Sequence, residues 1–211
     1  MGNKVDVDVC LKKLELVGNI SMATVDETGM PRDRIISTLL FEGRKIFFYT
    51  ARGKHFYKEL VETKKVSMLA YTKFNEQIRL NGEVNLVEQD KQREYIDKIF
   101  EKYPYLYNVY PEKTNEIGAI FVVENAEIEY FDLKVPVYRE YFSIGNYEPK
   151  KVGFVITEKC IKCGTCFRNC PQKAIEQKEF GYKIRQYNCL HCGNCFEKCP
   201  VKAITRIEDM D

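Results

Sequence analysis

The sequence predicts an α+β protein with two domains: an antiparallel β-barrel with inserted helices, and a small domain organised by cysteines. Short apolar runs that alternate with polar residues, separated by turn residues such as Gly, Pro and Asp, fill most of residues 1–133. Eight of the nine cysteines lie in the last quarter of the chain. With 211 residues and 45% apolar composition, the chain is long enough for one large domain or two small ones.

The first domain is expected to alternate strands with a few helices. Residues 6–17 predict a helix because Val9, Leu14 and Val17 recur at helical spacing, and we expect Cys10 to be buried within it. The other predicted helices are 53–62 and 89–103, and the predicted strands are 19–25, 32–41, 44–50, 65–71, 76–88, 117–123 and 126–133. Six or seven antiparallel strands with inserted helices predict a small barrel.

Residues 134–150 contain two prolines and no clear apolar period, which indicates a linker. Their Val, Tyr and Phe content predicts that this linker packs against the protein. We therefore expect a barrel domain at 1–133, a linker at 134–150 and a cysteine domain at 151–211.

Within the barrel domain, the tyrosine-rich segment YPYLYNVY at 103–110 is expected to line an interface or a pocket, and the alternative is stacking on a bound ligand.

The cysteine domain contains an internal duplication. An offset of 29 residues superimposes CIKCGTCFRNCPQKAI, residues 160–175, on CLHCGNCFEKCPVKAI, residues 189–204. A β-like run precedes each copy, and a proline stands at the expected first turn of a helix. Each copy is therefore predicted to form a strand, a cysteine loop and a short helix.

The cysteine spacing indicates a metal centre. Reducing compartments keep thiols unpaired, so this spacing in an intracellular chain favours metal binding over disulfides. Three cysteines at i, i+3 and i+6 direct three thiolates at one compact object, and a cubane cluster with four irons needs a fourth thiolate from elsewhere. The alternative, a structural zinc site, uses separated Cys-x2-Cys pairs instead of triplets followed by Cys-Pro.

This segment resembles the bacterial ferredoxins that carry two clusters, whose pattern is C-x2-C-x2-C-x3-C-P. In that family the last cysteine of each run ligates the cluster of the other run. The resemblance implies two [4Fe–4S] clusters. Their implied ligands are Cys160, Cys163, Cys166 and Cys199 for one cluster, and Cys189, Cys192, Cys195 and Cys170 for the other.

The charge distribution is consistent with that loading. Residues 151–211 hold eleven Lys or Arg and seven Asp or Glu, a net charge of +4 within a chain of net charge +2. Two oxidised clusters with their thiolates carry about −2 each, which would bring this domain near neutrality.

His191, inside the second cysteine run, is expected to face solvent, and the alternative is that it tunes a cluster.

The first domain resembles the pyridoxamine-5′-phosphate-oxidase-like, FMN-binding split β-barrel family over about residues 15–130. The resemblance is carried by ISMATVDETGMPRDRIISTLLFEGRKIFFYTARGKHFYKELVETKKVSMLAY and EQIRLNGEV, in this order and spacing. It implies a homodimer with one FMN in each of two clefts between subunits. It does not imply activity on vitamin B6 compounds, because cysteine loops replace the oxidase's C-terminal substrate-binding segment.

The same resemblance implies roles for individual residues. Arg34 and Lys54 would pair with the FMN phosphate and Thr50 would donate to it, as a doubly charged phosphate requires. The spacing from Tyr49 to Lys54 is shorter than in the oxidase, so Arg52 or Lys58 is the alternative cation. The remaining implied cofactor residues are Tyr49, Ile35, Ile36 and Ser37 along the ribityl chain and ring, and Gln77 from the partner subunit at the isoalloxazine edge.

Together these features predict an iron–sulfur flavoprotein oxidoreductase. It would move electrons between an external low-potential carrier such as a ferredoxin, the clusters and FMN, and would reduce a substrate that the sequence does not identify. One alternative is a ferredoxin-type electron carrier or sensor whose barrel serves dimerisation or ligand binding. Another is a barrel that binds deazaflavin or haem, although His55 is the only histidine outside the cysteine loops.

Other partner classes are not expected. Basic and acidic residues are interspersed, so there is no field of one sign that would favour nucleic acid or a membrane surface. The chain shows neither a secretory signal nor a long apolar run, and we expect a cytoplasmic protein. No G-x-G-x-x-G follows a strand, so a built-in dinucleotide-binding domain is not expected.

Overall fold

A computed structural model describes residues 5–210, which form two compact units. The first unit comprises residues up to 129 together with 141–149, and the second comprises 130–140 together with residues from 150 onward. Within residues 5–210, every helix is too short or too polar to cross a membrane.

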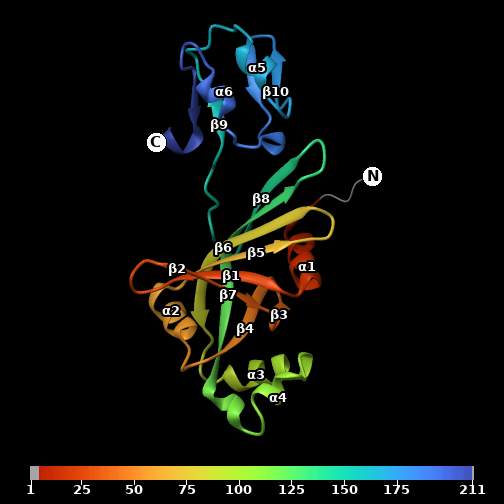
Figure 1. The fold of residues 1–211 in the computed structure, drawn as a ribbon, viewed down its shortest axis with the longest axis vertical. Coiled ribbons are helices and arrows are strands. Elements are labelled where there is room, and N and C mark those ends of the chain that lie inside the picture. Colours follow the sequence, from red (N-terminus) through yellow and green to blue (C-terminus); the bar gives the residue numbers. More distant parts are fainter. Residues whose placement is uncertain (1–4, 211) are drawn as a thin grey trace. The chain divides into compact units, whose positions relative to one another are not determined.

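An eight-stranded antiparallel sheet forms the first unit (Figure 1). The strand order is β2-β1-β5-β6-β7-β4-β3, and β8 pairs with β7. The strands are β1 Ile20–Val25, β2 Pro31–Ile36, β3 Leu39–Glu42, β4 Lys45–Ala51, β5 Lys65–Tyr71, β6 Glu76–Leu86, β7 Gly118–Asp132 and β8 Tyr138–Ile144. The helices are α1 Val7–Val17, α2 His55–Thr63, α3 Gln92–Lys102 and α4 Leu106–Val109, with a 3₁₀ turn at Thr114–Ile117.

The predicted strand 32–41 divides into β2 and β3. Residues 37 and 38 separate the two strands, yet β2 and β3 lie at opposite ends of the strand order. Because two residues span only about 10 Å between the flanking strands, the two edges of the sheet must approach each other. The sheet therefore curls, and the predicted barrel class is confirmed.

The two closing strands predicted at 117–123 and 126–133 form one long strand, β7. Glu124 and Asn125, expected to interrupt the strand, continue it as half-buried residues, and the Asn125 side chain accepts a hydrogen bond from the Asn146 backbone N–H (3.1 Å). Residues 134–150, predicted as a packed linker, contain β8.

The first helix begins and ends as its sequence predicts. The Asp6 carboxylate accepts a hydrogen bond from the Val9 N–H (2.8 Å), which caps the N-terminus, and Gly18 ends the helix at φ 73°. Cys10, Leu11 and Leu14 are buried on its inner face. The expectation that Cys10 contributes to the core is confirmed.

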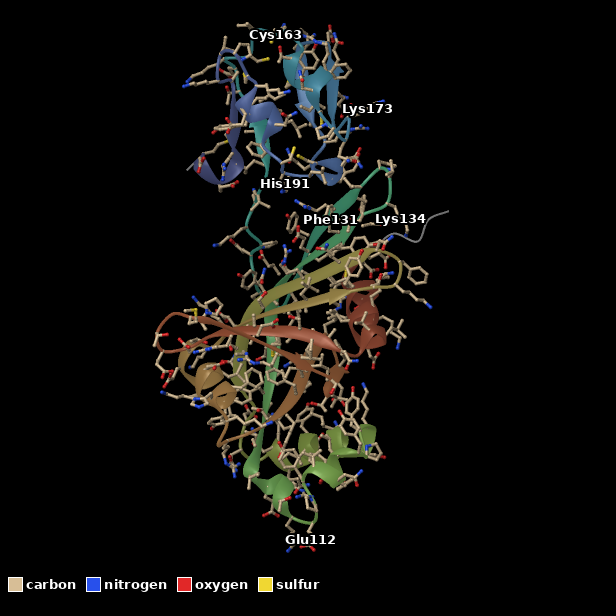
Figure 2. All side chains as sticks on the ribbon, in the orientation of Figure 1. Glu112, Phe131, Lys134, Cys163, Lys173 and His191 are labelled. Atoms are coloured by element: carbon tan, nitrogen blue, oxygen red, sulfur yellow. The ribbon has the colours of Figure 1, made fainter. Side chains whose placement is uncertain are left out.

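Besides residues 130–140, which form the tip of the β7–β8 hairpin, the second unit contains two strand pairs and two short helices. Strand β9 (Phe154–Ile156) pairs with β12 (Ile204–Arg206), and β10 (Ile175–Lys178) pairs with β11 (Gly181–Ile184). The helices are α5 Thr165–Asn169 and α6 Asn194–Glu197, with 3₁₀ turns at Gln186–Asn188 and Ile207–Asp209. Figure 2 labels Cys163 in the first cysteine loop and His191 in the second.

The predicted helices after the prolines were wrong in position. Both helices lie inside the cysteine runs, starting after Gly164 and Gly193, and the chain continues after Pro171 and Pro200 into a turn and a strand. Cys170 precedes Pro171 and is extended, with φ −72° and ψ 118°, which ends α5. A helix does not follow either proline because Lys173 and Lys202, two residues further on, adopt the left-handed backbone, with φ of 51° and 50°.

Gly82 in β6 tests the packing of the sheet. A Cβ at this position would lie 2.5 Å from both the Asn125 carbonyl oxygen and the Ala126 Cβ, so the backbone of β7 would have to move. We expect Gly82→Ala to lower the free energy of unfolding by about 1–3 kcal/mol, as overpacking does, in a denaturant titration. Gly53→Ala is the control, since nothing lies within 4 Å of its added Cβ; equal stabilities of the two variants would contradict this packing.

Candidate cluster and phosphate sites

The cysteines surround two cavities. The first is lined by Cys160, Cys163 and Cys166 of the first copy and Cys199 of the second. The second is lined by Cys189, Cys192 and Cys195 of the second copy and by Cys170 of the first. Each cavity therefore takes three thiols from one copy and one from the other, the exchange that the ferredoxin pattern implies.

Backbone N–H groups point at the sulfurs in the same way in both copies. The N–H of Ala174 lies 3.2 Å from Cys170 Sγ, and that of Ala203 lies 3.1 Å from Cys199 Sγ. Such donors favour the negatively charged thiolate that metals require. Four thiols per cavity with N–H donors form a donor set that suits a [4Fe–4S] cluster. Among residues 5–210, no three His, Cys, Asp or Glu side chains converge on a position for a single ion.

Both loops hold residues other than glycine in the left-handed region. Lys162 and its counterpart His191 have φ of 59° and 56°, and Lys173 and its counterpart Lys202 have φ of 51° and 50°. Such backbone costs about 1 kcal/mol or more per residue, so the surrounding structure must hold it. The sequence analysis did not predict this conformation at Lys162, Lys173, His191 or Lys202.

The buried thiols hold their protons in the metal-free chain. Burial raises the pKa of Cys166 and Cys189, and raises that of Cys195 to about 11. At the exposed Cys163 the pKa is instead lowered, chiefly by a hydrogen bond with the Thr165 hydroxyl. Metal binding by the buried cysteines must therefore release protons.

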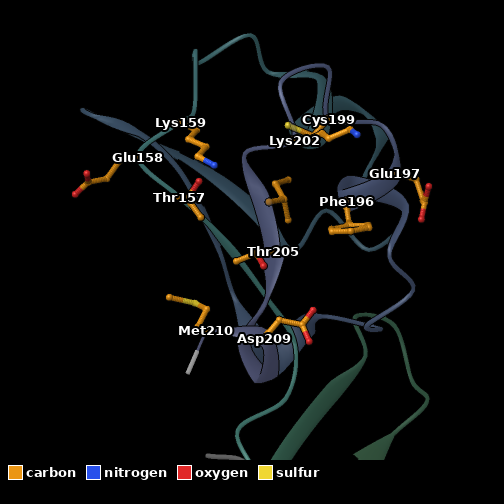
Figure 3. Close-up of a pocket in the computed structure, with 11 residues that line it drawn as sticks. Thr157, Glu158, Lys159, Phe196, Glu197, Cys199, Lys202, Thr205, Asp209 and Met210 are labelled. Atoms are coloured by element: carbon orange, nitrogen blue, oxygen red, sulfur yellow. The ribbon is translucent and has the colours of Figure 1, made fainter.

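An open groove lies beside the first cavity (Figure 3). Cys199 lines both this groove and the cavity, and Phe196, Lys202 and Thr205 continue the groove's wall. This groove exposes one edge of the first cysteine site to solvent.

Arg34, the predicted phosphate ligand, already has an acidic partner within the chain. Its guanidinium donates to Glu59 Oε2 (2.7 Å) and lies 4.4 Å from the centre of the Phe56 ring. Glu59 is buried and also accepts from the Thr24 hydroxyl. Sequence reasoning missed Glu59, although a carboxylate on the apolar face of α2, beside Phe56 and Leu60, was a signal for a buried cation.

The three candidate lysine or arginine cations downstream of Tyr49 differ in their contacts. Arg52 donates to the backbone carbonyls of Gly118 and Glu116 at 2.5 and 2.6 Å. Lys58 lies 3.5 Å from Glu27 and 3.9 Å from Glu62. Lys54 is exposed at the N-cap of α2 and forms no ion pair with the described residues. The geometry thus favours Lys54 for binding an added anion.

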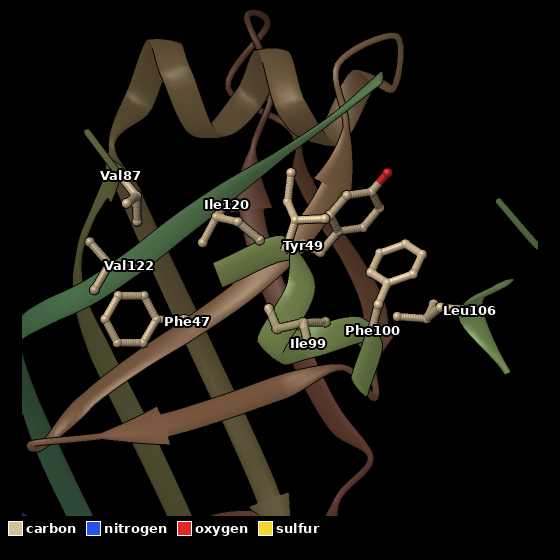
Figure 4. Packing of buried hydrophobic residues seen from close by; sticks show 9 residues of the cluster. Phe47, Tyr49, Val87, Ile99, Phe100, Leu106, Ile120 and Val122 are labelled. Carbon is tan, nitrogen blue, oxygen red and sulfur yellow. The ribbon is translucent and has the colours of Figure 1, made fainter. Parts of the chain in front are cut away.

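Thr50 and Tyr49 lie on opposite faces of β4. Thr50 shares a face with Phe48, whose ring stacks on Phe56 of α2, so Thr50 faces the same region as Arg34. Tyr49 points the other way into an apolar cluster with Phe100 of α3, and Figure 4 shows this packing. The Tyr49 hydroxyl donates to the Asn115 carbonyl (3.0 Å), and burial raises its pKa to about 12. The Tyr49 side chain therefore points away from the region that holds Arg34.

The other predicted cofactor residues spread across the sheet. Ile36 is half-buried on the face that holds Arg34, while Ile35 is 64% exposed on the opposite face. The Ser37 hydroxyl lies 3.0 Å from the hydroxyl of Tyr105, which belongs to the tyrosine-rich segment. Gln77 lies on β6, three strands away from Arg34 on β2. One subunit therefore does not bring Gln77 to Arg34.

Family models match both units. A model described as pyridoxamine 5′-phosphate oxidase matches residues 13–131, and a 4Fe-4S dicluster domain model matches residues 159–203. Both sequence resemblances are thereby confirmed.

Two curated relatives are pyridoxine/pyridoxamine 5′-phosphate oxidases from Agrobacterium fabrum and Sinorhizobium fredii, each 32% identical over 77 residues. The match covers 36% of this chain and 37% of each relative, so the chain spans little more than a third of the relatives it matches.

Solved structures share the barrel fold. A NimC/NimA family protein from Clostridium acetobutylicum has a TM-score of 0.56 and 26% identity, covering 65% of this chain and 93% of that one. A haem-binding protein from Mycobacterium smegmatis has a TM-score of 0.53 and 11% identity, covering 66% and 59%. PhzG from Burkholderia lata, in complex with tetrahydrophenazine-1-carboxylic acid, has a TM-score of 0.52 and 15% identity, covering 69% and 91%. The last two similarities concern the fold alone.

Cys170→Ala tests the exchange of cysteines between the copies. After anaerobic reconstitution with iron and sulfide, the variant should lose protection from alkylation at Cys189, Cys192 and Cys195, because these three line the cavity that Cys170 completes. The cysteines of its own run should stay protected, and mass spectrometry distinguishes the two groups. Cys199→Ala is the matched control with the converse pattern. Loss of protection within the mutated residue's own run would contradict the exchange.

Proposed function

Since the chain belongs to the pyridoxamine 5′-phosphate oxidase family and also carries a 4Fe-4S dicluster domain, we propose that it is an iron–sulfur flavoprotein oxidoreductase. It would take electrons from an external low-potential carrier, pass them through two [4Fe–4S] clusters to FMN, and reduce a substrate there. FMN supplies two-electron chemistry, whereas each cluster exchanges one electron. Two clusters therefore match the two electrons of one reduction.

The main support for the flavin assignment is that the start of α2 is suited to bind an anion. This nine-residue helix begins without a side-chain cap and without an acidic residue in its first turn, so its first N–H groups can serve a phosphate. Lys54 stands at the N-cap, Arg34 stacks on Phe56 in the first turn, and Thr50 faces the same region. These groups supply the charge and donors that a phosphate needs.

Arg34 would serve the phosphate while retaining Glu59. One guanidinium nitrogen donates to the Glu59 carboxylate and the other reaches Thr24, and a guanidinium carries five N–H donors in total. Glu59 thus holds the guanidinium in place, while its charge reduces the attraction of Arg34 for an anion. Under this proposal Lys54 contributes the larger share of net positive charge.

The proposal includes a homodimer. On the outer face of the sheet, Ser21 lies in register between the exposed apolar residues Ile35 and Leu69. One pair along, the small residue Ala23 lies between Asp33 and the small residue Ser67. Gln77 lies on this same face by strand alternation, since its neighbour Ile78 is in the core. If two such faces pack together, Gln77 of each subunit can approach the cofactor bound by the other.

The remaining parts of the proposal follow from the same chemistry. A reduced cytoplasmic setting suits cysteines that are unpaired in the structure. The groove beside Cys199 gives an external electron carrier access to the first cysteine site. Haem binding by the barrel is not proposed, because His55 lies exposed at the start of α2 and the similarity to the haem-binding protein concerns the fold alone.

Lys54→Gln tests the flavin site. We expect this variant to weaken FMN binding by about 1.5–3 kcal/mol, the usual value for a hydrogen bond to a charged group, or on the order of 10- to 150-fold in Kd. The measurement is quenching of FMN fluorescence on titration with flavin-free protein.

Lys58→Gln is the matched control, because Lys58 lies one turn further along α2 beside Glu27 and Glu62, and its FMN affinity should be unchanged. Equal losses in the two variants would contradict the assignment to Lys54. If the unaltered protein neither binds FMN nor gains thermal stability from it, the flavin proposal fails and the electron-carrier alternative stands.

A further inference from the structure

The two cysteine loops have the same backbone conformation, but different residues pack against them. Their positive-φ residues and N–H contacts to sulfur recur at the same offset of 29 residues. The second loop, however, is contacted by residues 130–140, which belong to the same compact unit. These residues are the tip of the β7–β8 hairpin and precede both cysteine runs in the chain. The duplication therefore does not make the two cluster environments equal.

The hairpin tip is held on the second loop by specific contacts. The buried side-chain amide of Asn188, directly before Cys189, donates to the Val137 carbonyl (2.7 Å). The rings of Tyr138 and Tyr187 are in contact, with centroids 6.3 Å apart. The residue that corresponds to Asn188 in the first copy is Lys159, which is exposed.

Arg139 reaches from the hairpin to the cysteine loop itself. Its Nη1 lies 2.6 Å from His191 Nδ1, and its guanidinium stacks 4.4 Å from the centre of the Phe131 ring. Figure 2 labels Phe131 on the hairpin and His191 on the loop. Because a guanidinium can only donate, His191 Nδ1 is the acceptor of this hydrogen bond. The expectation that His191 faces solvent is wrong, because this contact half-buries the ring.

This contact brings a permanent positive charge close to the second cavity. The His191 backbone N–H points at Cys189 Sγ (3.4 Å), so the guanidinium, the histidine and the ligand sulfur form one chain of contacts. An arginine keeps its charge throughout the accessible pH range. A field that favours a more negative sulfur also favours the reduced, more negative form of a cluster bound there.

We propose that Arg139 raises the reduction potential of the cluster held by Cys170, Cys189, Cys192 and Cys195. Reduction adds one electron to this cluster without other chemistry, and the nearby guanidinium offsets the added negative charge. The inference rests on the proposed loading of both cavities. Near the first cavity the nearby positive charge is that of Arg168. Its side chain is exposed, so solvent screens this charge more strongly than that of the half-buried Arg139.

Arg139→Gln tests this role. Protein reconstituted anaerobically is titrated with reductant, and the one-electron steps of the two clusters are followed by electron paramagnetic resonance. We expect the variant to lower one step by at least 59 mV, a tenfold change in a one-electron equilibrium, and to leave the other step unchanged. Arg139→Lys, which keeps the charge, should retain most of the unaltered potential.

Two further variants complete the test. Arg168→Gln is the matched control and should move only the other step, by less. Phe131→Leu keeps the charge but removes the ring on which it stacks, so it should lower the same step as Arg139→Gln by a smaller amount.

Unchanged potentials in fully loaded Arg139→Gln protein would overturn the proposal. So would loss of iron in Arg139→Gln and Phe131→Leu while Arg168→Gln loads normally, because Arg139 would then be structural. If the unaltered protein itself holds only about four irons per chain, one cluster's worth, the two-cluster assignment fails, and with it the premise of this inference.

Discussion

The first unit depends on how the chain crosses between β2 and β3. Two residues, Ser37 and Thr38, connect the strands at opposite ends of the sheet order, so the sheet must close on itself. Closure brings Arg34 of β2 close to α2, the helix that follows β4. Glu59 of α2 then pairs with the Arg34 guanidinium. The anion-binding region at the start of α2 thus results from the closure of the barrel.

A second constraint governs the cysteine unit. Each run supplies three thiols to one cavity and the fourth to the other, so neither cavity is complete without both copies. The cysteine spacing predicted three ligands of each cavity, because those three cysteines lie close together in one run. The fourth came from the resemblance to ferredoxins, since nothing in one run specifies its partner. The loop conformation was harder to predict, because Lys162, His191, Lys173 and Lys202 have no sequence signal for a left-handed backbone.

The features of the candidate sites that the sequence did not predict share one cause: contacts between residues distant in the chain. The resemblance to the family named Arg34 as a phosphate ligand, but its pairing with Glu59, 25 residues away, depends on the packing of α2 under the sheet. Likewise, the contact between Arg139 and His191 spans 52 residues and depends on where the hairpin tip lies. Tyr49 was expected along the cofactor, whereas strand alternation turns its side chain into the cluster beneath α3. Periodicity predicted the elements well, but which face meets which neighbour is decided by tertiary packing.

Under the proposed function, one chain holds a flavin in its barrel and two iron–sulfur clusters in its cysteine unit. The most direct measurement is the content of iron, acid-labile sulfide and flavin in anaerobically purified and reconstituted protein. Two [4Fe–4S] clusters and one barrel site should give about eight irons, about eight sulfides and about one FMN per chain. About four irons, or barrels that remain free of flavin in the presence of excess FMN, would contradict it.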